Sequence, residues 1–362
     1  MTSSGTTTPA QATTTSDEAG NWFPENLAQI CNRLTATTAQ SSAVPPVAVF
    51  DFDNTCIFRD VGQAVFRYQA QHLRYRLTPR QLDAILPKTA GQLAGRPLTA
   101  LTTTLLDAYR ALYPLVAAGK QDEALRLPEY RLFAVLLLWL TDKARKDERL
   151  GPRYVLPFMG KLLAGFSIAE LRHLAVEVVQ KVRQEPLIEE TLSVEAPEPV
   201  GRIEASYPLG LHAFPEMQAL MHRLARQGIE RYVISASTEW LVEGAAQLLE
   251  FPVAADHIFG IRLRLDERDV LTIDDPIDYP VTFREGKAEI ITQRISGRPV
   301  LIAGDADTDF EMLTLPGVDL RLLLNRRQNG LISTLYQDPD ILLQGLDLTS
   351  GRFRPTRESI GG

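Results

Sequence analysis

Cysteine is scarce in this chain, and long apolar runs are missing. Only Cys31 and Cys56 occur among 362 residues, which is too few for a disulfide framework and does not match the spacing of a zinc site. The longest uninterrupted apolar run, Leu132–Leu140, is about half as long as a membrane helix requires. Nothing before Trp22 forms the apolar region of a secretory signal. We therefore expect a cytoplasmic protein without a transmembrane segment, although an exported protein given without its leader would look the same.

Positive charge is also in deficit. Lysine and arginine together number 38 against 45 aspartates and glutamates, so the net charge is −7. A basic surface for polyanions is not expected, which argues against nucleic acid or an anionic membrane as a main partner. The chain is 45% hydrophobic and 23% charged, which is typical of a soluble globular protein. At about 150 residues per domain, its length indicates two domains or one enlarged domain. The sequence does not indicate an oligomeric state.

The hydrophobic pattern divides the chain into parts. Residues 1–20 form a Thr/Ser/Ala tract that we expect to be a disordered tail. An apolar, strand-like run at 44–50 is followed by helical patterns from 61 to about 190, and 185–205, rich in Glu and Pro, reads as a return linker. After Pro208, helix and strand patterns alternate.

This alternation predicts an α/β fold. We expect a Rossmann-like, doubly wound parallel sheet core formed by residues 21–60 and 206–362. An all-helical cap domain, residues 61–205, would be inserted after the first strand of that core.

Two carboxylates follow the first predicted strand. Asp51 and Asp53 stand two residues apart at its C-terminal end, where the strand gives way to a loop, so both can face one pocket. Open α/β sheets bind their ligands at this end of the strands.

Other polar residues occupy similar positions later in the chain. Asp305 and Asp309 come after the apolar run 300–303, Ser235 follows another predicted strand, and Lys287 stands at a helix start. Taken singly, each has an ordinary explanation: an acidic loop can be a solvated turn, the serine can cap the next helix, and the lysine can lie on the surface. Taken together, the acids favour a hard cation such as Mg²⁺, and the hydroxyl and ammonium groups suit a phosphoryl group.

The order and context of these residues resemble the haloacid dehalogenase superfamily. Its four motifs are Asp-x-Asp-x-Thr, a strand-end Ser or Thr, a Lys, and Gly-Asp-x-x-x-Asp. The resemblance covers about residues 44–58 and 208–330. The chain matches the motifs at Asp51, Asp53 and Thr55, at Ser235, at Lys287, and at Gly304, Asp305 and Asp309.

The resemblance implies a phosphatase. Asp51 would be the nucleophile that accepts the phosphoryl group as an aspartyl-phosphate, and Asp53 would be the general acid and base. Thr55, Ser235 and Lys287 would bind the phosphoryl oxygens.

The resemblance also implies a Mg²⁺ site. The cation would be held by Asp51, by the backbone carbonyl of Asp53, and by Asp305. Asp309 would either sit beside the metal or orient Lys287.

The nature of the substrate depends on fewer residues. We expect a small phosphorylated metabolite, because the large cap would close over the site. Asp60 stands at the offset where phosphoserine phosphatases bind an ammonium group, and the wider motifs look nearer to the phosphorylcholine-phosphatase-like branch. A cationic head such as that of phosphocholine or phosphoserine is therefore expected, with Phe58 as an aromatic contact. A solvated or ion-paired Asp60 and a core-packed Phe58 are the alternatives.

Two other functions fit the same residues. A phosphotransferase or phosphomutase would pass the phosphoryl group to an alcohol instead of water. A non-catalytic binding protein could keep the fold, although a decayed site usually loses the nucleophile or a metal-binding acid.

Overall fold

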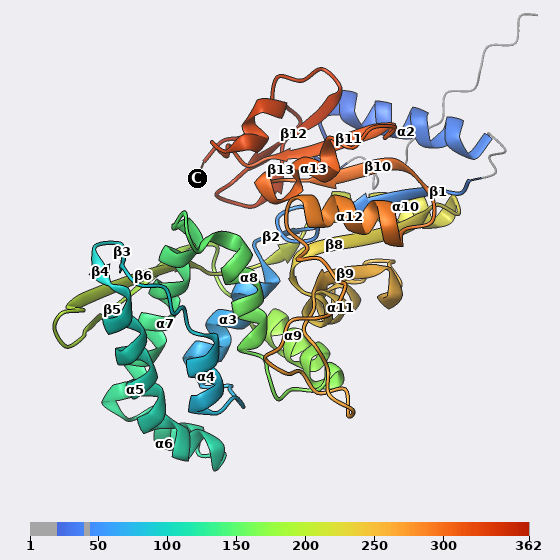
Figure 1. The fold of residues 1–362 in the computed structure, drawn as a ribbon. Coiled ribbons are helices and arrows are strands. Elements are labelled where there is room, and N and C mark those ends of the chain that lie inside the picture. Colours follow the sequence, from blue (N-terminus) through green and yellow to red (C-terminus); the bar gives the residue numbers. More distant parts are fainter. Residues whose placement is uncertain (1–19, 40–43, 362) are drawn as a thin grey trace, which may run out of the picture.

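The centre of the molecule is a seven-stranded sheet (Figure 1). The computed structural model describes residues 20–39 and 44–361, so the predicted tail lies almost wholly outside the described residues. Short β13 is antiparallel to β12 at one edge, and the other strands are parallel, which confirms the predicted fold class. In spatial order the strands are β13 (Arg352–Phe353), β12 (Ile341–Asp347), β11 (Leu320–Asn325), β10 (Arg298–Gly304), β1 (Pro46–Phe50), β8 (Glu230–Thr238) and β9 (Ile258–Ile261).

Helices cover both faces of this sheet. Side chains alternate along β1: Ala48 and Phe50 belong to the hydrophobic cluster on one face, and Val47 and Val49 belong to the cluster on the other. Because both faces are buried, the strand is apolar throughout, as parallel strands usually are. The first face is covered by α2 (Pro24–Ala39), α10 (Pro215–Arg226) and α11 (Glu239–Leu248), and the second by α12 (Glu285–Arg294) and α13 (Phe310–Leu313). Short 3₁₀ turns are Ala255–His257, Asp307–Asp309 and Leu331–Leu335.

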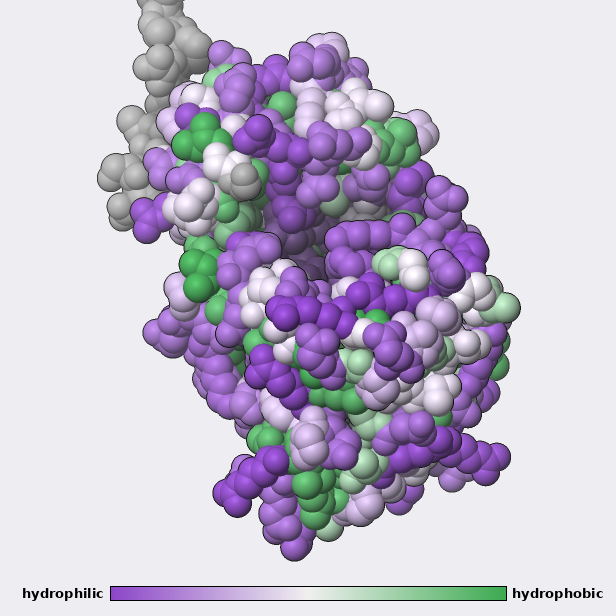
Figure 2. Space-filling model, turned by 90° about the vertical axis from the view of Figure 1, so that its left-hand side faces the viewer, coloured by the Kyte–Doolittle hydropathy of each residue, from purple (hydrophilic) through white to green (hydrophobic). Residues whose placement is uncertain are grey.

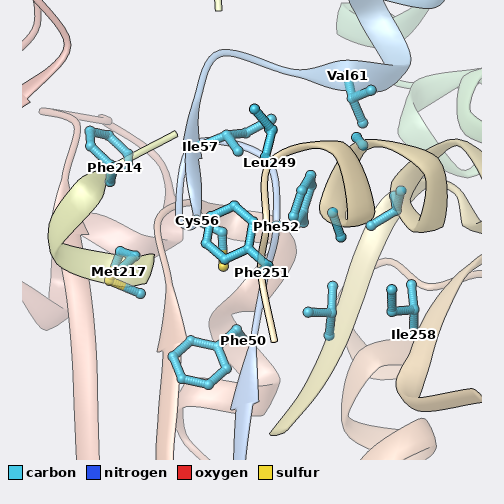
Figure 3. Close-up of a cluster of buried hydrophobic side chains, with 14 of the residues drawn as sticks. Phe50, Phe52, Cys56, Ile57, Val61, Phe214, Met217, Leu249, Phe251 and Ile258 are labelled. Atoms are coloured by element: carbon cyan, nitrogen blue, oxygen red, sulfur yellow. The ribbon is translucent and has the colours of Figure 1, made fainter. Parts of the chain in front are cut away.

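The loop after β1 is anchored by its apolar residues. Phe52 and Cys56 are fully buried, and the ring of Phe52 meets that of Phe251 edge to face with centroids 5.6 Å apart (Figure 3). Asp51 and Asp53 flank Phe52 in the sequence, so packing of this ring holds both carboxylates in place.

The insertion leaves and re-enters the core through two paired strands. β2 (Ile57–Phe58) and β7 (His212–Ala213) are antiparallel to each other and lie at its two ends. Most of the insertion has a hydrophobic cluster of its own. Its elements are α3 (Val61–His72), α4 (Pro79–Ile85), β3 (Gln92–Leu93), β4 (Arg96–Pro97), α5 (Leu98–Ala117), α6 (Gln121–Ala124), α7 (Pro128–Lys146), α8 (Gly151–Lys161), α9 (Ile168–Val182), β5 (Glu189–Glu195) and β6 (Arg202–Pro208).

The insertion is mostly helical, but it is not all-helical. The segment 185–205, which the sequence suggested as a linker, contributes most of the hairpin β5–β6, which projects from the insertion (Figure 1). Burial alternates along β6, where Ile203, Ala205 and Tyr207 are buried and the residues between them are exposed. These three side chains belong to the insertion's hydrophobic cluster. Because every second residue is buried, the segment forms a strand despite the surrounding Glu and Pro residues.

One helix of the insertion packs on the core rather than on the insertion. α9 lies against α11, and its apolar side chains belong to the same cluster as α2 and α10. The contact is close at Gly244, where a Cβ atom would come within 2.4 Å of the carbonyl oxygen of Arg172. The expected division at residues 60 and 205 therefore stays a prediction, because packing crosses it.

Candidate active site

The site begins where two neighbouring strands end. Asp51 follows β1 and Asp305 follows β10, and the two strands are paired up to this point, with the Asp51 N–H donating to the carbonyl of Ala303 at 2.9 Å. The chain continues from β1 to β8 and β9 on one side and later to β10, β11 and β12 on the other. Doubly wound sheets bind ligands at such a reversal of strand order.

Lys287 links two of the predicted acidic residues. Its Nζ donates to Asp51 Oδ1 and to Asp309 Oδ1, each at 2.6 Å, and the lysine is completely buried. The alternative of a surface lysine is therefore wrong. Burial alone would lower the pKa of Lys287, but the carboxylates of Asp309 and Asp51 outweigh it and raise the pKa above its ordinary value.

Asp309 is held by the backbone of the loop after β10. Its Oδ2 accepts hydrogen bonds from the N–H groups of Asp305 (2.9 Å) and Ala306 (3.2 Å). Gly304 makes this possible, since a Cβ at that position would lie 2.7 Å from Asp309 Cβ. Both oxygens of Asp309 are thus engaged within the protein, one of them by Lys287. Of the two roles left open by the sequence, the structure shows the contact with Lys287.

Thr55 and Arg326 complete the surroundings of Asp305. The Thr55 hydroxyl lies 3.2 Å from Asp51 Oδ2 and 3.2 Å from Asp305 Oδ1, and can donate to one of them at a time. Arg326 Nη1 donates to Asp305 Oδ2 at 2.6 Å. Sequence reasoning missed this arginine, although its position directly after β11 puts it at the same edge of the sheet.

Asp53 is held by three donors. Its Oδ2 accepts from the hydroxyls of Ser235 (2.9 Å) and Ser237 (2.7 Å), and its Oδ1 accepts from the N–H of Val61 (2.7 Å). Burial, and then the charge of Asp60, raise the pKa of Asp53 to about 7, although these hydrogen bonds act in the opposite direction. Sequence reasoning missed Ser237, which could have been found as the second serine of Ser-Ala-Ser at the end of β8.

Ser235 does not cap a helix. It is fully buried, its hydroxyl donates to Asp53, and Thr238 is the residue that precedes α11. The Thr282 hydroxyl donates to the Ser235 carbonyl at 2.6 Å, which ties the end of β8 to the segment before α12. Thr55, Ser235 and Lys287 are buried and are not among the described residues that line the adjoining cavity. Their expected contacts with a phosphoryl group stay a prediction.

A cavity of about 720 Å³ opens beside Asp51 and Asp53. One part of its wall comes from the strand ends of the core and the other from α3, α7 and α8 of the insertion. In the space-filling view the surface is hollowed between the two parts of the molecule, with hydrophilic residues around the hollow (Figure 2). A ligand in the cavity would therefore contact both parts.

Asp60 lines this cavity, but Phe58 is not among the residues that line it. Asp60 is the N-cap of α3: its Oδ1 accepts from the N–H of Gln63 (2.8 Å) and its Oδ2 from the side-chain amide of Gln63 (3.0 Å). Phe58 is buried in the core, where its ring stacks on His212 and meets Phe214. In the described residues, the aromatic side chains that do line the cavity are Phe66 and Phe283.

The donor set fits a divalent cation. Oxygen atoms of Asp51, Asp305 and Asp309 lie within 4.8 Å of one another, and all three residues are buried. Asp53 adds another buried carboxylate, whereas the neighbouring cations are Lys287 and Arg326, so acid is in excess. Burial, and then the charge of Asp309, raise the pKa of Asp51 well above its ordinary value. A cation bound to these carboxylate oxygens would offset the free-energy cost of burying several negative charges together, and Mg²⁺ is the simplest choice.

Comparisons with known proteins place the fold. No family model matches the chain, and no curated protein matches it. A solved structure of a conserved protein of unknown function from Anaerococcus prevotii DSM 20548 is 24% identical, covers 95% of this chain and 98% of its own, and has a TM-score of 0.82. The two proteins share one fold.

The residues of the four predicted motifs gather at one end of the parallel sheet, which is the arrangement that the resemblance to the haloacid dehalogenase superfamily implies. Two more distant structures were also found. A protein of unknown function from Bordetella pertussis Tohama I is 15% identical, covers 84% of this chain and 100% of that chain, and has a TM-score of 0.47. A substrate-bound phosphoserine phosphatase is 12% identical, covers 79% of this chain and 87% of that chain, and has a TM-score of 0.37. Likenesses this weak do not bear on activity, which we infer from the chain's own residues.

No helix in the described ranges is both long and apolar enough to cross a membrane.

Proposed function

We propose that the chain is a phosphomonoester hydrolase of the haloacid dehalogenase type, acting on a small phosphorylated metabolite. One observation carries the proposal. The Asp51 carboxylate is held by Lys287 at 2.6 Å on the wall of a cavity, beside a second acid, Asp53, whose pKa of about 7 suits proton transfer at neutral pH. A nucleophile and an acid–base group are thus two residues apart on one anchored loop.

In the first step, a carboxylate oxygen of Asp51 attacks the phosphorus atom of the ester. An oxygen–phosphorus bond forms to Asp51 and the bond from phosphorus to the alcohol oxygen breaks. Asp53, in its protonated form, gives its proton to the leaving alcohol oxygen, and the alcohol departs. Lys287 keeps the Asp51 carboxylate oriented and offsets its charge.

In the second step, water attacks the phosphorus atom of the aspartyl-phosphate. Asp53, now a carboxylate, takes a proton from the water, and the bond between Asp51 and phosphorus breaks. Inorganic phosphate leaves, and both acids return to their starting states. The hydroxyls of Ser235 and Ser237 orient the oxygen of Asp53 through both steps.

The proposed cofactor is Mg²⁺, held by Asp51, by the backbone carbonyl of Asp53 and by Asp305. When bound, it supplies positive charge that lets a carboxylate approach a phosphate dianion. Asp309 is proposed to position Lys287 rather than to bind the metal directly, because its oxygens already accept from Lys287 and from two backbone N–H groups. By contrast, in the part of the chain that the structure describes, Asp51 Oδ2 and Asp305 Oδ1 share a single donor, the hydroxyl of Thr55.

A cationic head on the substrate is the finer form of the proposal. It is supported by Asp60, which lines the cavity and would attract an ammonium or choline group. Phe58 does not support it, since this ring is packed in the core and does not line the cavity.

The first test is phosphate release from a nitrophenyl phosphate and from phosphocholine, phosphoserine and sugar phosphates, with Mg²⁺ and with EDTA. We expect turnover that requires Mg²⁺ and falls at least about a thousandfold in Asp51→Asn. Asp122→Asn, at an exposed aspartate of α6, is the matched control and should keep full activity. Absence of turnover on every substrate by the folded wild type would sink the proposal and favour a binding protein.

A phosphotransferase or phosphomutase remains the alternative on the same site. Supplying an acceptor alcohol separates the two reactions, because a transferase yields phosphorylated acceptor in place of free phosphate.

A further inference from the structure

The cavity is lined by several cations, and most of them already have acidic partners. Arg326 donates to Asp305 at 2.6 Å. Arg284 donates to Glu311 through its Nε at 2.8 and 2.7 Å and through its Nη2 at 2.5 Å. Lys146 Nζ lies 2.7 Å from Asp142, and its side chain is 70% exposed. The basic residues that line the cavity are Arg145, Lys146, Arg284 and Arg326.

Arg145 differs from the other three. It lies in the last turn of α7 and is partly buried. Over residues 20–39 and 44–361, its one polar contact is from Nη2 to the sulfur of Met159 at 3.6 Å, and no carboxylate pairs with it. A thioether is a weak acceptor, whereas a guanidinium offers five donors in a planar fork. Arg145 therefore presents donor groups and a positive charge that the protein itself leaves unmatched.

Apolar residues line the same cavity as Arg145. Met159, which contacts the guanidinium, lines the same cavity as Leu156 of α8 and Leu241 of α11. The cavity volume of about 720 Å³ is in the range that holds a whole small ligand and not only a phosphoryl group. The other apolar lining residues nearby in the fold are Val65, Phe66 and Leu163.

We propose that Arg145 binds an oxyanion at the far end of the substrate's alcohol portion, with an apolar segment between that oxyanion and the scissile phosphoester. The planar guanidinium matches a carboxylate or a phosphoryl group through paired hydrogen bonds. The apolar segment would lie against the wall formed by Leu156, Met159 and Leu241. The inference rests on the proposed function for the end at which Asp51 and Asp53 act.

Binding measurements test the proposal without turnover. Calorimetry would compare heptylphosphonate with its ω-carboxylate counterpart, in wild type and in Arg145→Met, with Mg²⁺ present. We expect wild type to bind the ω-carboxylate compound at least about tenfold more tightly than heptylphosphonate, and Arg145→Met to lose this preference. Both proteins should bind heptylphosphonate equally. The control Lys146→Met removes a neighbouring cation that is exposed and ion-paired, and should keep the preference.

Activity separates this inference from the proposed function. If hexyl phosphate is hydrolysed, but its ω-carboxylate counterpart shows no gain in kcat/KM and the calorimetric preference is absent, the role of Arg145 is overturned and the hydrolase stands. If neither these esters nor any substrate of the first test is hydrolysed while the calorimetric preference depends on Arg145, the hydrolase fails and oxyanion binding at Arg145 stands. A preference that survives in Arg145→Met also overturns the proposal.

Discussion

A single buried ammonium, that of Lys287, serves two buried carboxylates, those of Asp51 and Asp309. Removing it by Lys287→Met leaves both acids without that partner in a poorly solvated place. We expect the free energy of unfolding to fall by about 3–5 kcal/mol, because breaking a buried ion pair leaves uncompensated charge. Urea denaturation at neutral pH measures this change.

The same variant should lose phosphatase activity by about a hundredfold or more, since Asp51 loses its positioning partner. Lys146→Met is the control: its lysine is 70% exposed, and the expected change in unfolding free energy is within about 0.5 kcal/mol. A stability loss of similar size in both variants would contradict the interpretation of Lys287.

At the scale of residues, the sequence allowed the motif positions to be predicted but not all their contacts. Asp51, Asp53, Asp305, Asp309 and Lys287 do meet at one site. The sequence could not show the contacts of Ser237, Arg326 and Arg145, because these depend on which strand ends and helix ends lie side by side. It also offered Phe58 as a substrate contact, but the pairing of β2 with β7 places that side chain in the core.

At the scale of elements, the close packing of α9 on α11 depends on Gly244. In Gly244→Ala the new methyl group would meet the carbonyl of Arg172 at 2.4 Å, and because this atom is backbone, the helices must separate. We expect a loss of about 1–3 kcal/mol in unfolding free energy, measured by urea denaturation.

Gly160→Ala is the matched control for that change. Gly160 also lies in a helix and is buried, but its Cβ would meet its nearest neighbours at 3.5 Å, an ordinary contact distance. The variant should be neutral or more stable by up to about 1 kcal/mol. Equal destabilisation of both variants would show that the approach to Arg172 is not what matters.

The start of α9 gives a prediction for pH dependence. Hydrogen bonds from Arg76 and from the backbone of Ser167 lower the pKa of Glu170 to about 2. A carboxyl group whose pKa is lower in the folded state than in the unfolded state stabilises the protein at a pH above its unfolded-state pKa, which is about 4.5 for Glu170. This contribution to stability is lost as the pH falls toward 2. Glu170→Gln keeps the capping geometry but removes the charge.

We therefore expect Glu170→Gln to be less stable than wild type at pH 6, with a difference that shrinks between pH 4.5 and 2. Urea denaturation across this range gives the measurement. When Arg76→Gln is already present, Glu170→Gln should lower the free energy of unfolding at pH 6 by less than it does in wild type, because the ion pair between these residues is already lost. A difference that does not vary with pH would contradict the assignment.

Among the elements, strongly periodic helices were predicted well and irregular segments were not. α5 and α7 fall within residues 61 to about 190, where the hydrophobic pattern predicted helices. α8 lies in the same range and accommodates both Pro152 and Pro157. The sequence did not indicate β12 as a separate strand. This strand contains Gly345, where a Cβ atom would lie 2.5 Å from the backbone carbonyl oxygens of Thr356 and Glu358.

At the scale of the whole molecule, the acidic residues of the site come from segments more than 250 residues apart in the sequence. A cation bound to them would therefore stabilise the folded state of the whole core. We expect Mg²⁺ to raise Tm, since a ligand at about 100 times its Kd stabilises the folded state by about 2.7 kcal/mol. Differential scanning calorimetry with Mg²⁺ and with EDTA measures this shift.

Asp305→Asn should abolish most of the shift, and Asp122→Asn should retain it. A Mg²⁺ shift of the same size in Asp305→Asn would show that the cation binds elsewhere.

The hydrogen bond from Val61 to Asp53 has a consequence for motion. Val61 is the first residue of α3, so the insertion itself supplies one of the donors that favour the ionised form of Asp53. A displacement of α3 away from the loop would remove that donor, but it would also remove the charge of its N-cap Asp60, which raises the pKa of Asp53 by more than the Val61 donor lowers it, so the pKa of Asp53 would fall. The protonation of the acid–base group is thereby coupled to the position of the insertion. Opening and closing of the cavity would change the protonation state of Asp53 as well as the access of substrate to it.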